Sequence, residues 1–181
     1  MTRTPVALVH GWGGSFASTW ERSGFTALLE DAGVPVIGVD LLGHGDAPKP
    51  HDPDAYGDLT ARIAGALPDE PVDAVGFSLG AITLLRLAID HPHRFGRLVL
   101  AGIGSNIFDR DSSGTQAIVA GLEHVAAGGD PSTLDTRVRL FTQYAAQPGN
   151  DLAALTAVMK RAPATAITPD DCAAVGCPVL V

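Results

Sequence analysis

The chain has 181 residues, of which 46% are hydrophobic and 18% are charged, so it predicts a globular domain with a sizeable core and excludes a disordered chain. Its formal net charge is −8 and its 12 basic residues form no run, which argues against nucleic acid or an anionic membrane as partner. No apolar run approaches the length of a membrane span and the first residues lack a signal-peptide pattern, so we expect a cytoplasmic protein.

Short apolar runs alternate with helical segments along most of the chain. We expect strands over 5–9, 34–39, 72–77, 97–101 and 177–181, and helices over 23–31, 56–67 and 79–90. Ser23 is the expected N-cap of the first of these helices. Alternation of this kind predicts the α/β class, with a mostly parallel sheet flanked by helices.

The rhythm changes between the fourth and fifth expected strands. Helical patterns cover 115–127, 133–146 and 151–161, with glycine- and proline-rich breaks between them. We interpret this helical insertion as a cap or lid, although helices that only pack against the core would give the same pattern. The predicted organisation is a core over 1–111, a cap over 112–166 and a return to the core over 167–181.

A serine lies at the junction between one strand and the long helix that follows it. Gly76-Phe77-Ser78-Leu79-Gly80 has the spacing G-x-S-x-G, which is typical of a nucleophile elbow. A sharp strand-to-helix turn exposes the serine hydroxyl and crowds the positions two residues to either side, which favours glycine there. The start of the helix also provides free N–H groups and a positive dipole end.

With two further motifs, the chain resembles the α/β-hydrolase fold family over nearly its whole length. Residues 6–13 are similar to the family's strand and H-G loop, and residues 39–47 resemble its D-x-x-G-x-G-x-S turn. In that turn, Ala47 stands where serine is common. The expected fold is therefore an α/β-hydrolase core with a helical cap insertion.

The resemblance also implies roles for individual residues. Ser78 would be the nucleophile, and the backbone N–H groups of Trp12 and Leu79 would form the oxyanion hole. The residues expected to support the loop and the elbow are His10, Gly11, Gly13, Gly76 and Gly80. We expect neither His10 nor His44 to act as the catalytic base.

The remaining members of the triad are expected outside this sequence. In the family, the acid usually follows the strand that here begins at Pro178, and the histidine comes later still. We therefore expect the chain to be the C-terminally incomplete part of a hydrolase and to be inactive by itself. Asp109 follows the strand after the elbow, where some members of the family carry the acid.

The activity implied by the resemblance is hydrolysis of a small-molecule carboxylic ester, or of a related acyl substrate, through an acyl-serine. A perhydrolase or acyltransferase on the same fold, and a non-catalytic binding module, are the alternatives. We predict no cofactor, because the glycines near Trp12 lack the dinucleotide spacing and the chain has no P-loop. We also predict no metal site, because Cys172 and Cys177 fit no ligand quartet. The oligomeric state is not predicted.

Overall fold

The structure is a computed structural model that describes residues 3–108 and 112–181. Five strands form one sheet in the order β2-β1-β3-β4-β5, and all neighbouring strands are parallel. They are β1 (Val6–Val9), β2 (Val36–Val39), β3 (Val72–Phe77), β4 (Phe95–Ala101) and β5 (Val179–Leu180). The predicted α/β class with a parallel sheet is confirmed.

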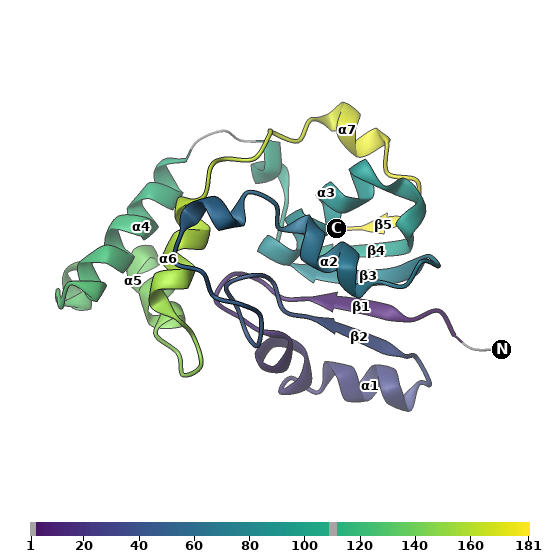
Figure 1. Ribbon diagram of the computed structural model, residues 1–181, viewed down its shortest axis with the longest axis horizontal. Helices are drawn as coiled ribbons and strands as arrows, with labels where there is room; N and C mark the ends of the chain where they lie inside the picture. The colour runs from purple at the N-terminus through teal and green to yellow at the C-terminus, as the bar shows by residue number, and fades with distance from the viewer. Residues whose placement is uncertain (1–2, 109–111) are drawn as a thin grey trace.

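Helices cover both sides of this sheet. On one side lie α2 (Thr60–Ala66), α3 (Leu79–Asp90) and α7 (Pro169–Ala173), and on the other α1 (Phe25–Asp31) lies against β2 (Figure 1). Shorter helical turns connect the elements; they are Ala17–Glu21, Pro53–Tyr56, Pro92–Arg94, Ser105–Phe108 and Pro131–Thr133.

Two helix starts differ from the sequence prediction. The helix expected from Ser23 begins at Phe25, with Gly24 as its N-cap at φ 79°, because the Ser23 hydroxyl instead donates to the carbonyl of Trp20 in the preceding turn. The helix expected over 56–67 is divided, because the Asp58 carboxylate accepts the backbone N–H of Thr60 at 2.8 Å and starts a new helix there.

Three consecutive helices follow β4 in the chain, before α7 and β5. They are α4 (Ser113–Ala126), α5 (Thr136–Ala145) and α6 (Leu152–Lys160), and they pack against one another beyond the carboxyl ends of the strands (Figure 1). The carboxylates of Asp135 and Asp151 cap α5 and α6 by accepting backbone N–H groups of the first turn. The structure thus places this helical segment at the edge of the sheet that carries Ser78.

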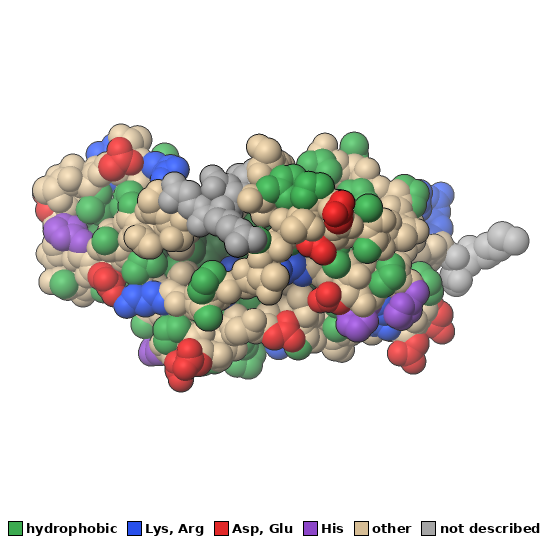
Figure 2. Space-filling view, turned by 90° about the horizontal axis from the view of Figure 1, so that it is seen from above, with side chains coloured by type: hydrophobic (Ala, Val, Ile, Leu, Met, Phe, Trp, Pro, Cys, Tyr) green, Lys and Arg blue, Asp and Glu red, His purple; other side chains and the backbone are tan. Residues whose placement is uncertain are grey.

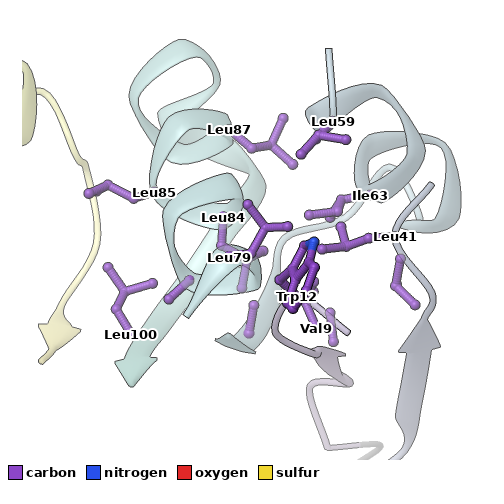
Figure 3. Close-up of a cluster of buried hydrophobic side chains, with 14 of the residues drawn as sticks. Val9, Trp12, Leu41, Leu59, Ile63, Leu79, Leu84, Leu85, Leu87 and Leu100 are labelled. Atoms are coloured by element: carbon purple, nitrogen blue, oxygen red, sulfur yellow. The ribbon is translucent and has the colours of Figure 1, made fainter. Parts of the chain in front are cut away.

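The hydrophobic core lies between the sheet and α3. Leu84, Leu87 and Leu100 are almost completely buried, and the indole of Trp12 belongs to the same cluster (Figure 3). Complete burial of one such leucine stabilises the fold by about 1.5–3 kcal/mol. Thr83 is also buried in α3, where its hydroxyl donates to the carbonyl of Leu79. The core therefore holds α3, and with it the residue before its first turn, firmly against the sheet.

Charged side chains of both signs lie on the surface. On the face drawn in Figure 2, Lys and Arg side chains are dispersed among acidic ones and do not gather into a patch. Within the described residues, no helix is both long and apolar enough to cross a membrane. That the protein does not bind nucleic acid stays a prediction.

Candidate active site

Ser78 occupies the turn between β3 and α3. Its backbone has φ 50° and ψ −112°, and it is the only non-glycine residue with a positive φ in the described part of the chain. Such a conformation costs on the order of 1–3 kcal/mol and persists only where the surroundings enforce it. Here the Ser78 N–H donates to Ala101 on β4 at 2.8 Å, and its carbonyl accepts the N–H of Ile82 at 3.0 Å.

The glycines on both sides of Ser78 are sterically required. A Cβ at Gly76 would lie 2.7 Å from the backbone N and Cα of Ala81, and one at Gly80 would lie 2.6 Å from the carbonyl oxygen of Val9. Both obstacles are backbone atoms of buried elements, so no change of rotamer can relieve them. The turn therefore excludes every side chain at these two positions.

The loop after β1 passes beside the serine. A Cβ at Gly11 would lie 3.3 Å from the Cβ of Ser78. The Gly11 carbonyl accepts two hydrogen bonds, from His10 Nδ1–H at 2.7 Å and from the Gly14 N–H at 3.1 Å. Because the peptide is trans, the N–H of Trp12 points opposite to this carbonyl. The orientation of the Trp12 N–H is thereby fixed.

Two backbone donors beside Ser78 remain free. Among the described residues, no acceptor takes the N–H of Trp12 or that of Leu79. Leu79 is the first residue of α3, so its N–H has no partner within the helix and lies at the positive end of the helix dipole. An oxygen atom that carries negative charge next to Ser78 would be stabilised by both donors.

Two buried histidines lie beneath this loop. His10 donates from Nδ1 and accepts the Leu41 N–H at Nε2, so it is neutral although Asp40 Oδ1 is only 3.4 Å from Nε2. Burial lowers the pKa of His10, and burial together with the nearby His10 lowers the pKa of His44 to about 4. Within the described residues, no histidine forms a hydrogen bond with the Ser78 hydroxyl.

The Asp40 carboxylate connects the turn at residues 39–47 to the segment that follows β1. One carboxylate oxygen accepts the N–H of Phe16 at 2.6 Å and the other accepts the N–H of Asp46 at 2.8 Å. A Cβ at Gly45 would overlap this carboxylate, which explains the glycine there. Ala47, where the family often has serine, is buried. The D-x-x-G-x-G turn thus supports the loop after β1 from below.

The turn between α5 and α6 reaches the same loop from above. The side-chain amide of Asn150 donates to the Gly13 carbonyl at 2.8 Å and to the Tyr144 carbonyl at 3.2 Å. The Trp12 indole N–H donates to the carbonyl of Leu155 at 3.1 Å. Sequence reasoning missed Asn150, Tyr144 and Leu155, because they lie more than 130 residues from the loop and no local pattern marks them.

The surroundings of the site are partly open. The Phe77 ring, next to Ser78, is 45% exposed. One hollow of about 340 Å³ lies between β2 and α2, and another of about 510 Å³ lies near the end of α3. Ser78 lines neither of them. The described residues contain no group of three metal-ligating side chains. Asp109, the candidate acid, lies outside the described residues.

Comparisons with known proteins identify the family of this fold. A family model of the alpha/beta hydrolase fold matches residues 4–159. The chain is similar to pimeloyl-[acyl-carrier protein] methyl ester esterase of Neisseria meningitidis, with 41% identity over 99 residues, which cover 52% of this chain and 35% of that protein. It is also similar to esterase Rv0045c of Mycobacterium tuberculosis, with 31% identity over 126 residues, or 64% and 40% of the two chains.

A solved structure supports the fold alone. NosK from Streptomyces actuosus is 24% identical, with a TM-score of 0.67 over 98% of this chain and 75% of that one. The matched part spans only about a third of the length of the meningococcal esterase. The resemblance inferred from the three motifs is confirmed: the chain belongs to the alpha/beta hydrolase fold family.

Proposed function

We propose that the protein is a carboxylic ester hydrolase with Ser78 as its nucleophile. The observation that carries this proposal is the strained backbone of Ser78 between the free N–H groups of Trp12 and Leu79. Strain of this kind is concentrated at functional sites, and here it places a hydroxyl beside two unpaired donors. The esterase names of two relatives support the same reaction class.

The reaction would proceed through an acyl-serine. The Ser78 Oγ attacks the ester carbonyl carbon, and the carbonyl oxygen becomes an oxyanion held by the N–H groups of Trp12 and Leu79. The alcohol leaves with a proton, and water then attacks the acyl-serine to release the acid. Loss of one oxyanion donor typically lowers kcat by about 10²–10³.

A general base must take the Ser78 proton and return it to the leaving alcohol. Among the described residues, no histidine forms a hydrogen bond with the Ser78 hydroxyl, and both His10 and His44 are buried. From the family resemblance, we expect the base and its acid partner after residue 181. General-base assistance is typically worth 10²–10⁴-fold, so its source decides the activity.

We also propose that α4, α5 and α6 form a cap over the site. They lie at the carboxyl ends of the strands, where open α/β sheets bind their ligands, and they contact the loop that carries Trp12 (Figure 1). The substrate would be a small ester bound between the cap and Ser78. A perhydrolase or acyltransferase would use the same acyl-serine with another acceptor.

The test is Ser78→Ala in the full-length protein, with p-nitrophenyl acetate as substrate. We expect at least about 10⁴-fold loss of turnover, because triad members act as a unit; removal of the serine in subtilisin is the reference case. Ser105→Ala is the matched control, since Ser105 is an exposed serine on the loop after β4. If the alanine variant at position 78 keeps most of its activity, the nucleophile is wrongly assigned.

Two further arms refine this experiment. Competing alcohols and peroxide separate a hydrolase from an acyltransferase or perhydrolase by the products formed. The 181-residue chain alone should turn over the ester no faster than its Ser78→Ala variant, because no histidine bonds Ser78 within the described residues. Strong Ser78-dependent turnover by the short chain would instead implicate His10 or His44 as the base.

A further inference from the structure

Two peptide groups connect the α5–α6 turn to the N–H of Trp12. The first joins Gly13 to Gly14: its carbonyl accepts the Asn150 amide at 2.8 Å, and its N–H donates to the Gly11 carbonyl at 3.1 Å. The second joins Gly11 to Trp12, and its own N–H is the free donor beside Ser78. Donation therefore runs in one direction, from Asn150 through both peptides to Trp12.

This direction matters because hydrogen bonds in a chain polarise one another. A peptide that accepts a hydrogen bond at its carbonyl becomes a stronger donor at its N–H, by about 10–30% per bond. Asn150 begins this polarisation, and His10 Nδ1–H adds to it at the Gly11 carbonyl. Gly13 has a φ of 74°, and this conformation allows the Gly14 N–H to reach the Gly11 carbonyl.

The Asn150 amide is itself fixed by two bonds. One N–H holds Gly13 and the other holds the Tyr144 carbonyl at the end of α5, so both of its donors are used. The Tyr144 ring lies directly over Gly13, where an added Cβ would be 2.8 Å from the ring. The Asn150 amide can therefore make both hydrogen bonds only while the end of α5 is packed against the loop after β1.

We propose that Asn150 is a positioning residue of the oxyanion hole. It orients and polarises the Trp12 N–H through the two peptides, so the donor reaches full strength only while the helical segment is seated. This inference rests on the proposed function, because it needs an oxyanion beside Ser78. An interaction that strengthens with oxyanion charge lowers kcat when it is lost and leaves KM nearly unchanged.

A role limited to the fold of the turn makes a different prediction. Asn150 also closes the turn through its backbone N–H, which donates to the Gln147 carbonyl at 3.1 Å, and it precedes the N-cap of α6. Substitution of a residue with only this role would change the stability of the protein, and it would affect binding of the substrate and of the transition state equally. The two roles therefore differ in how they treat a tetrahedral adduct.

The experiment compares Asn150→Asp, Asn150→Ala and Gln147→Ala in the full-length protein. Asn150→Asp keeps the shape but cannot donate when ionised, whereas Gln147→Ala removes an exposed amide from the same turn. We measure kcat and KM with a p-nitrophenyl ester and Ki for a trifluoromethyl ketone, which forms a tetrahedral adduct with the serine. The matched methyl ketone, which binds without forming the adduct, and thermal unfolding serve as further readouts.

For Asn150→Ala we expect kcat to fall and the trifluoromethyl ketone Ki to rise, each about tenfold, which is less than the loss of a whole oxyanion donor. Asn150→Asp should lose more, because its charge opposes the oxyanion. KM, the methyl ketone Ki and the Gln147→Ala variant should stay within about twofold of wild type.

Two results would overturn the inference. If the Asn150 variants match Gln147→Ala, or lose stability while the trifluoromethyl ketone Ki is unchanged, Asn150 serves only the fold. If Ser78→Ala retains activity in the same assay, the proposed function fails and the inference fails with it. Ser78-dependent activity in wild type separates these two cases.

Discussion

The two sides of the candidate site are held in different ways. The elbow around Ser78 is confined by backbone atoms of β1 and α3, as the contacts at Gly76 and Gly80 show. The loop that carries Trp12 also bonds to groups from far along the sequence, namely the Asn150 side-chain amide and the Leu155 carbonyl. Ser78 is therefore positioned by the core, whereas the loop that carries Trp12 also depends on contacts from the helical segment.

The largest effect should follow a change on the elbow side. Gly80→Ala, or the larger Gly80→Val, should destabilise the protein by about 3 kcal/mol or more and abolish activity, because the new Cβ meets the carbonyl of Val9. Gly65→Ala is the matched control: Gly65 lies within α2 with open space around it, and alanine there should stabilise by up to about 1 kcal/mol. Urea unfolding measures both. Equal stability of the two variants would show that the elbow is not rigid.

The loop side should be sensitive to acid. The pKa of His44 in the folded protein is lowered from 6.5 to about 4. Between these two pH values the unfolded chain binds a proton at His44 and the folded chain does not. The contribution of His44 to the free energy of unfolding should therefore be fully present above about pH 6.5, and it should fall by about 3 kcal/mol as the pH drops to about 4. Burial lowers the pKa of His10 as well, in the same direction.

The check is urea unfolding across this pH range for wild type and His44→Gln. Glutamine stays neutral, so the variant should lose stability less steeply, by about 1.4 kcal/mol per pH unit for the missing proton. Parallel curves for the two proteins would contradict the buried neutral state of His44. The four other histidines are exposed, so they provide no comparable effect of burial.

The smallest effect should follow a substitution at Gly13, and a second substitution at Tyr144 should partly reverse it. Gly13→Ala meets the Tyr144 ring and has an unfavourable φ of 74°, so we expect a loss of about 2 kcal/mol. In a Tyr144→Ala background the steric part should disappear, which leaves about 1 kcal/mol. A double-mutant cycle by urea unfolding measures this coupling. If the cycle shows no coupling, the ring does not confine the loop.

Much of the core could be predicted from the sequence. The apolar runs gave the five strands, because strands buried on both faces read as continuous hydrophobic segments. The helix starts at Ser23 and near Tyr56 were wrong, because the Ser23 hydroxyl bonds to the Trp20 carbonyl and the Asp58 carboxylate accepts the Thr60 N–H. Such local competition among polar groups cannot be ranked without coordinates.

The sequence by itself determined the elbow, since the strain and the two glycines belong to neighbouring residues and leave a pattern of fixed spacing. Only the tertiary structure decided how the loop that carries Trp12 is held. The Asn150 amide and the Gly13 carbonyl are 137 residues apart, and their hydrogen bond depends on how α5 and α6 pack over the sheet. A contact between distant residues leaves no periodic or spaced signal in one sequence, because any residue of suitable chemistry can provide it once the fold brings it near.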